Sequence, residues 1–187
     1  MAALSTDPSN RTAPPARCRG SLSFRTGVER LPRLEQAADA PWEVLLAAQV
    51  LRPLGVPDVR LVVPPTPSEP VGHVVGRNGQ LHPWTRPGSA TLPTALAPAG
   101  AVRMRLDDLL TYLIAHRDRP SSFLTPEHWR RLHTAPFDDG YALGWFVDGE
   151  GNQWHDGSNG MWLATAWIER RGGRVRRCAQ RRHADSA

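Results

Sequence analysis

The chain has 187 residues and a formal net charge of +5, from 23 Lys+Arg and 18 Asp+Glu, and every one of its basic residues is an arginine. The absence of lysine excludes mechanisms that need a lysine base, a Schiff-base lysine or a P-loop lysine. Residues 170–187 hold seven of the arginines and a single acid, so residues 1–169 hold 16 arginines against 17 acids. The high sequence pI therefore describes the C-terminal tail and does not indicate a basic domain.

The N-terminal segment, residues 1–37, is rich in Pro, Ser, Ala and Arg and predicts mostly irregular structure. The exception is a helix from about Gly27 to Ala38, which Pro32 would interrupt. Residues 1–20 contain no apolar stretch typical of a signal peptide, so the sequence leaves the location unknown, with the cytoplasm as the default. No run approaches the roughly 18 apolar residues of a membrane span, so we expect none. The two cysteines, Cys18 and Cys178, lie near opposite ends and predict neither a disulfide scaffold nor a metal site.

The first ordered elements are expected after residue 38. Pro41 suits the first turn of a helix, and Pro53 with Gly55 predicts its end. Residues 71–76 read as a short strand, which Asn78-Gly79 follows as a turn. The proline-rich residues 56–70 and 82–100 predict loops.

The clearest helix is predicted over residues 105–117, where leucines and an isoleucine recur at helical spacing and two aspartates occupy the first turn. A second helix is predicted to begin at Thr125, an N-cap residue followed by Pro126. Residues 141–148 and 161–169 are rich in Trp, Phe, Val and Thr, with a turn at 149–152, and predict an antiparallel strand pair.

The densest polar cluster runs from His155 to Gly160 and has two interpretations. It is either a turn before a strand, or a site on a strand edge where glycines admit a ligand and the Ser158 N–H stabilises an oxyanion. It lacks the Gly-x-Ser-x-Gly spacing of a nucleophile elbow, because Gly157 directly precedes Ser158. His155 and Asp156 are adjacent on a predicted strand and should point to opposite faces, which disfavours a His–Asp relay.

No other cluster predicts chemistry. His128 and His133 are five residues apart and off a common helical face, so we expect no zinc site there. We interpret the four remaining histidines as surface or structural residues. The tail 170–187 could contact nucleic acid, but it contains no aromatic residue to stack on a base. We therefore expect a disordered tail and no nucleic-acid partner.

Four blocks within residues 38–169 follow one another in a recognisable order. They are Pro41 to Leu46 with Arg52 to Val56, Ala97 to Gly100 with Leu106 to Leu109, Tyr141 to Trp145, and His155 to Asn159. In this order they resemble the "PWEELL…PLGM" helix, the "PAGG…ADDLA" step, the "YGLGW" strand and the Lys/His-x-Gly motif in the C-terminal part of the β-lactamase-related serine hydrolases. That family includes class C β-lactamases, penicillin-binding proteins, D-Ala-D-Ala carboxypeptidases and esterases.

The resemblance implies an α/β fold, part of the serine β-lactamase-like antiparallel sheet with flanking helices. It also implies a reaction in which a serine of Ser-x-x-Lys is acylated by an ester, amide or β-lactam, without metal or cofactor. By the same resemblance, the Ser158 N–H, after Gly157, would form part of the oxyanion hole. His155 would meet the polar or anionic end of the substrate, with less standing charge than a lysine.

The chain departs from that family in its catalytic motifs. Without lysine there is no Ser-x-x-Lys, and neither Tyr112 nor Tyr141 begins a Tyr-x-Asn. We therefore assign no catalytic residue and expect a fragment or degenerate member, inactive on its own. The alternatives are a non-catalytic binding module, using a Trp-rich surface or the arginine-rich tail, and a poorly folded product.

Overall fold

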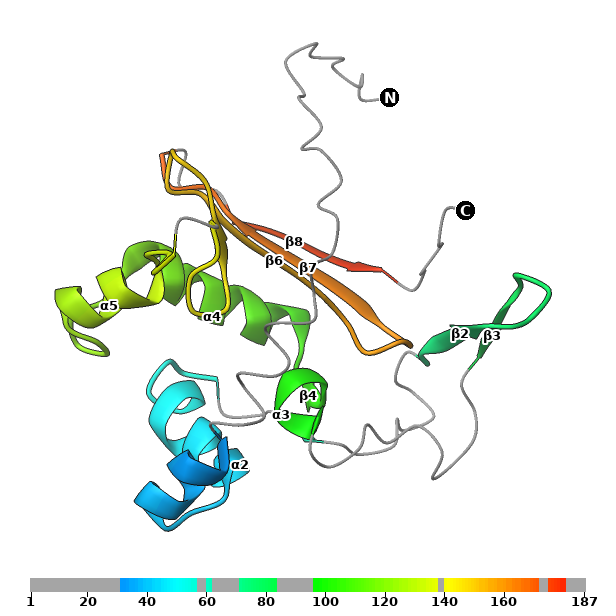
Figure 1. The fold of residues 1–187 in the computed structure, drawn as a ribbon, viewed down its shortest axis with the longest axis horizontal. Coiled ribbons are helices and arrows are strands. Elements are labelled where there is room, and N and C mark those ends of the chain that lie inside the picture. Colours follow the sequence, from blue (N-terminus) through cyan, green and yellow to red (C-terminus); the bar gives the residue numbers. More distant parts are fainter. Residues whose placement is uncertain are drawn as a thin grey trace.

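The computed structural model describes residues 31–56, 60–61, 71–83, 96–137, 140–171 and 175–180, and for 60–61 and 175–180 it describes the backbone (Figure 1). Residues 1–30 of the segment predicted to be irregular lie outside this set. Residues 31–38 are helical, which agrees with the described part of the helix predicted from about Gly27 to Ala38, and Pro32 lies in its first turn and does not interrupt it. The helix ends where Asp39 takes a positive φ of 49°, a conformation that aspartate tolerates better than most residues.

The helix predicted to begin at Pro41 is present in two parts. Helix α2 spans Trp42–Leu45, and the π-helix η1 continues it over Leu46–Leu51. In η1 the Arg52 N–H donates to the Ala47 carbonyl at 3.0 Å, five residues back. As predicted, the chain turns at Pro53 and Gly55, and Gly55 has a positive φ of 75°.

Two small antiparallel sheets follow. Strands β2 (His73–Val75) and β3 (Leu81–Pro83) form the hairpin whose first strand and turn were predicted. At the turn, the Asn78 side chain accepts from the Gln80 N–H at 3.1 Å and Gly79 has a positive φ. The predicted loops also contain regular structure in their described parts, namely strand β3, the short strand β1 (Arg60–Leu61) paired with β4 (Val102–Arg103), and helix α3 (Ala97–Gly100).

Helices α4 (Leu106–Asp118) and α5 (Pro126–Leu132) confirm the two strongest helix predictions. The Thr125 hydroxyl accepts from the backbone N–H of His128 at 3.3 Å, so Thr125 is an N-cap as predicted. Helix α4 ends at Arg119, which adopts the left-handed conformation and turns the chain toward α5.

The main sheet has four antiparallel strands in the order β5-β6-β7-β8. The turn at 149–152 joins β5 to β6, and a second turn at 159–162 joins β6 to β7. Two strand regions were predicted to pair directly, but a further strand, β6, lies between them. Its inward-facing residues are a glutamine, a histidine and a glycine, so it lacks the apolar alternation that marks a strand. The four strands are β5 (Phe146–Val147), β6 (Gln153–Ser158), β7 (Leu163–Ile168) and β8 (Val175–Gln180).

Strand β8 differs from the prediction that residues 170–187 are disordered. It pairs with β7 from Val175, opposite Ile168, to Gln180, opposite Leu163. Ladder hydrogen bonds use backbone groups, which an arginine-rich segment possesses like any other. Residues 172–174 and 181–187 lie outside the described part of the chain.

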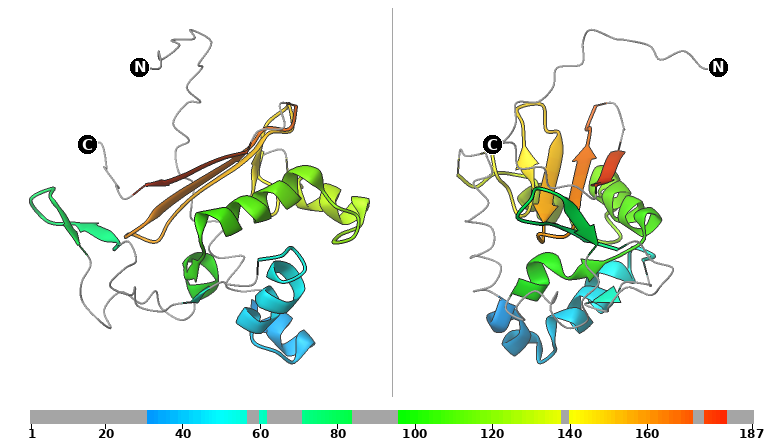
Figure 2. Two further views of the ribbon diagram at one scale, coloured as in Figure 1. Left: turned by 180° about the vertical axis from the view of Figure 1, so that it is seen from behind. Right: turned by 90° about the vertical axis from the view of Figure 1, so that its right-hand side faces the viewer.

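The described helices lie on one side of this sheet, and α4 packs against β7 and β8 (Figures 1 and 2). The core between them contains the buried residues Leu113, Ala142, Trp145 and Ile168. The result is a mixed α/β chain whose largest element is an antiparallel sheet. No helix in the described ranges is both long and apolar enough to cross a membrane.

Candidate active-site strand

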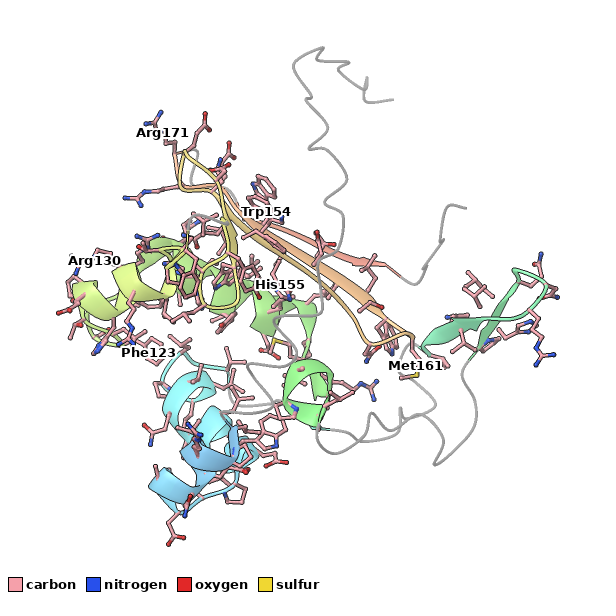
Figure 3. All side chains as sticks on the ribbon, viewed as in Figure 1. Phe123, Arg130, Trp154, His155, Met161 and Arg171 are labelled. Atoms are coloured by element: carbon pink, nitrogen blue, oxygen red, sulfur yellow. The ribbon has the colours of Figure 1, made fainter. Side chains whose placement is uncertain are left out.

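The polar cluster predicted as either a turn or a strand edge forms the end of β6. His155, Asp156, Gly157 and Ser158 all pair with β7, and only Asn159 onward belongs to the turn. Residues 155–158 of the cluster therefore lie within a strand and do not form a turn before one. Asp156 is exposed, whereas His155 lies on the face that carries buried Gln153 and contains the core. Figure 3 labels Trp154 and His155 on opposite sides of β6.

The Ser158 N–H points away from β7. In an antiparallel ladder, pairs that exchange hydrogen bonds alternate with pairs whose N–H and C=O groups face outward. The Asn159 N–H donates to the Trp162 carbonyl at 3.3 Å, so the next pair, Ser158 with Leu163, faces outward. The other end of β6 agrees: the Asp148 N–H donates to the Asn152 carbonyl at 3.2 Å, which makes Trp154 a bonded partner of β5.

Strand β5 is too short to cover this outward edge. It pairs with Gln153 and Trp154 only, and no described strand pairs with β6 on that side between His155 and Ser158. Ser158 itself is exposed, and its hydroxyl oxygen accepts the Gly160 N–H at 3.1 Å. This leaves the backbone N–H of Ser158 as the group that could receive a carbonyl or oxyanion at the edge.

The His155 imidazole lies along the strand over Gly157. A Cβ built on Gly157 would lie 3.4 Å from Nε2 of His155, so the absence of a side chain at Gly157 leaves room for the imidazole. His155 Nδ1 is buried without a hydrogen-bond partner among the described residues. The predicted residues His155, Gly157 and Ser158 therefore occupy one strand end, but the His155 ring and the Ser158 N–H have different directions.

Asn159 holds this strand end in place, and the sequence prediction assigned it no role. Its Oδ1 accepts the backbone N–H groups of Met161 at 3.2 Å and Trp162 at 3.0 Å. Its Nδ2 donates to the Gly100 carbonyl in α3 at 3.1 Å. The available signal was the dipeptide Asn159-Gly160, since Asn-Gly favours turns and Gly160 has a positive φ of 86°.

The hairpin β2–β3 contacts the same turn from another side. The His73 N–H donates to the Met161 carbonyl at 3.2 Å. A Cβ on Gly72 would lie 2.7 Å from the indole Nε1 of Trp162, so only glycine fits between them. The strand end is thus fixed by α3 through Asn159 and by the hairpin through Met161 and Trp162.

His116 and His133 meet in the interior. His116 was expected to be a surface or structural residue, and His133 was expected not to form a zinc site with His128. His116 Nδ1 and His133 Nε2 are 2.8 Å apart, and both side chains are buried. His128, five residues before His133, is exposed on α5. No group of three or more His, Cys, Asp or Glu side chains that could hold a metal ion exists among the described residues. Of the other histidines, His73 is half-buried and His82 exposed, and His183 lies outside the described residues.

The comparison with protein families gives one match. The model of the family described as Beta-lactamase matches residues 31–175, more than half of the chain. This range contains every described element up to the first residue of β8, and it extends beyond the 38–169 over which the motif blocks were recognised. No curated protein matches the chain. The match over this length identifies the chain as a member of the Beta-lactamase family.

Proposed function

We propose that this chain is a partial or degenerate member of the β-lactamase-related serine hydrolases that does not form an acyl-enzyme by itself. The motif blocks lie within 38–169, and the family match extends the domain to 31–175, which takes in the end of the segment 1–37 and the start of the tail 170–187. The parent reaction is acyl-serine hydrolysis of an ester, an amide or a β-lactam. The observation that carries the proposal is the combination of an open β6 edge with a sequence that contains no lysine.

The β6 edge supports the first part of the proposal, that the chain retains a place where a substrate carbonyl can bind. A carbonyl that approaches between His155 and Ser158 would meet the outward Ser158 N–H, and Gly157 admits it close to the backbone. His155 would lie on the neighbouring face for the polar end of the ligand. One N–H donor orients and weakly polarises a carbonyl, whereas an effective oxyanion hole combines several such groups.

The absence of a placed nucleophile and base supports the second part of the proposal, that the chain does not form an acyl-enzyme. The Ser158 hydroxyl is not placed as a nucleophile, because its oxygen accepts the Gly160 N–H in the turn. An activated serine needs a base within hydrogen-bond reach. Removing the nucleophile and its base abolishes the covalent route, and what remains is the smaller effect of binding and orientation.

Turnover by the purified chain tests the proposal directly. We expect hydrolysis of p-nitrophenyl acetate and of nitrocefin at the rate of the same amount of heat-denatured chain. We also expect no added mass on the intact chain after incubation with benzylpenicillin. Turnover tenfold above the denatured control would contradict the proposal. In that case S158A, with S122A at another exposed serine as the matched control, would show whether the Ser158 hydroxyl is the nucleophile.

A binding module is the second candidate, and one observation favours it. Aromatic rings form a row across the sheet, with Phe146 and Trp154 centroids 5.5 Å apart and Trp154 and Trp167 centroids 5.2 Å apart. Register places Trp154 and Trp167 on the face opposite the buried Gln153 and Ile168, and they are half-buried. Trp129 and Trp145 are buried in the core and cannot belong to such a surface.

The two candidates differ in what a ligand should perturb. A small ester or β-lactam should shift the amide resonances of Gly157 and Ser158. A protein partner on the aromatic row should instead quench Trp154 and Trp167 fluorescence, and the W167A variant should bind that partner more weakly. Binding through the arginine-rich tail would fall steeply with salt, and replacing its arginines by glutamine would remove that dependence.

A further inference from the structure

The paired imidazoles of His116 and His133 lie outside the β6 site and connect three elements. His116 is in the last turn of α4, and His133 follows the last residue of α5. Their facing nitrogens, Nδ1 of His116 and Nε2 of His133, are 2.8 Å apart, and the two side chains are only 5% and 7% exposed. A buried contact of this length requires one proton between the two nitrogens.

The second nitrogen of His133 determines which ring donates. His133 Nδ1 is buried without a hydrogen-bond partner among the described residues. If His116 donated, the neutral His133 would carry its own proton on Nδ1 as a buried, unpaired N–H. If His133 Nε2–H donates to His116 Nδ1, the unpaired atom is an acceptor lone pair, which is less costly. The second tautomer is therefore favoured.

Aromatic rings enclose the pair. The indole of Trp129 stacks on His133 at a centroid distance of 5.8 Å and meets His116 edge-on at 5.3 Å. The Trp145 ring lies 5.0 Å from His116, and Tyr112 lies 4.5 Å from it. This enclosure joins α4, α5 and the segment before β5, and it replaces the water that an imidazolium would need.

The charges that act on the pair are positive. Burial, His133 and Arg119 lower the pKa of His116 to about 3. Burial and the charges of Arg119 and Arg170 lower the pKa of His133 to about 4. Tyr112, the other titratable group in contact with the pair, stays neutral because burial raises its pKa to about 12. Both imidazoles are therefore neutral in the folded chain near pH 7.

We propose that His116 and His133 form an acid-sensitive clasp that holds α5 against α4 and the sheet when neutral and releases α5 when protonated. A first proton puts an uncompensated charge among three aromatic rings, near Arg119 and Arg170. A second proton places an N–H on both facing nitrogens, so their hydrogen bond is lost. Opening relieves both the buried charge and the two facing N–H groups, because water then solvates the imidazolium groups.

The clasp can control α5 because a helix of this length depends on the packing of its buried side chain. Helix α5 spans only seven residues, from Pro126 to Leu132. Its Trp129 is 1% exposed and donates from Nε1 to the Pro120 carbonyl at 3.1 Å. An isolated helix this short is not stable in water, so its structure depends on packing. Loss of the Trp129 enclosure should therefore melt α5 locally.

The lowered pKa values of the two histidines determine how opening of the clasp depends on pH. An open imidazole titrates near pH 6.5, so the closed state is fully favoured above that pH. Below it, opening takes up protons, and the closed population falls until the folded values of about 4 and 3 are reached. Each proton taken up on opening changes the open-to-closed ratio by about tenfold per pH unit.

Hydrogen exchange of the whole chain tests this proposal. Protection factors, corrected for intrinsic exchange at each pH, should fall at least tenfold for the amides of residues 127–133 between pH 7 and pH 5. The core strand β7 should keep its protection over that range. The double variant H116L/H133L replaces both imidazoles by apolar side chains of similar size, and its α5 protection should not depend on pH. The exposed H128Q on the same helix is the matched control and should behave as wild type.

A second measurement keeps the proposal testable if the double variant does not fold. In the wild-type chain with ¹³C-labelled histidine, two imidazoles should resist protonation down to pH 5 in the closed state, and they should broaden as α5 loses protection. An equal fall of α5 protection in the double variant would overturn the clasp. So would protonation of both rings near pH 6.5 with α5 still protected.

Discussion

Two regions of this chain contain histidine beside tryptophan, and they differ in what surrounds the ring. His155 lies half-buried at an open strand edge, with glycine as its neighbour and an outward backbone N–H three residues on. His116 and His133 lie sealed among Trp129, Trp145 and Tyr112. We propose that the first region admits a ligand and that the second takes up protons by opening. Residue type alone therefore does not separate a site from a core.

The sealed region should be the more sensitive to truncation, and Trp129 should show the largest effect. W129A removes a side chain that is 1% exposed and touches both imidazoles, so we expect a loss of about 3–5 kcal/mol in the free energy of unfolding. Urea denaturation at pH 7.5 measures it. F137A, at a side chain that is 75% exposed, is the control and should change stability by less than about 0.5 kcal/mol. A small effect of W129A would mean that α5 is not part of the cooperative fold.

The open region should depend on hydrogen bonds more than on packing. N159A removes the acceptor of Met161 and Trp162 and the donor to Gly100, and we expect a loss of about 1–3 kcal/mol. The Ser158 amide resonance should shift in the same variant. N78A removes one bond in an exposed turn and is the matched control, with a smaller loss and an unchanged Ser158 resonance. Equal effects of the two variants would show that Asn159 does not position the strand end.

The smallest expected effect sharpens the role of Gly157. In G157A the new Cβ would lie 3.4 Å from His155 Nε2, so the imidazole must move by a few tenths of an ångström. We expect a stability change below about 1 kcal/mol, together with a clear shift of the His155 imidazole resonances. G149A is the control, because a Cβ at Gly149 meets nothing within 4 Å. An unshifted His155 would contradict the placement of the ring over Gly157.

Local patterns predicted the elements whose signals lie within one segment. Helix α4 followed from leucine spacing, α5 from Thr125 and Pro126, and the β2–β3 turn from Asn78-Gly79. Periodicity did not place strand β6 between its neighbours, because Gln153, His155 and Gly157 on its inward face lack apolar character. The family resemblance did place the block from His155 to Asn159 on a strand. Strand β8 was missed because its arginines obscured a ladder that uses only backbone groups.

By itself the sequence determined the lack of lysine, and with it the loss of the Ser-x-x-Lys motif, and it determined the order of the motif blocks that mark the Beta-lactamase family. These are matters of composition and order along the chain. Only the tertiary structure decided that the Ser158 N–H faces an edge that no described strand covers, because this depends on ladder alternation and on where β5 stops. It also decided that His116 meets His133. The turn at Arg119 brings the two helices together, and the sequence pattern of neither helix predicts this contact.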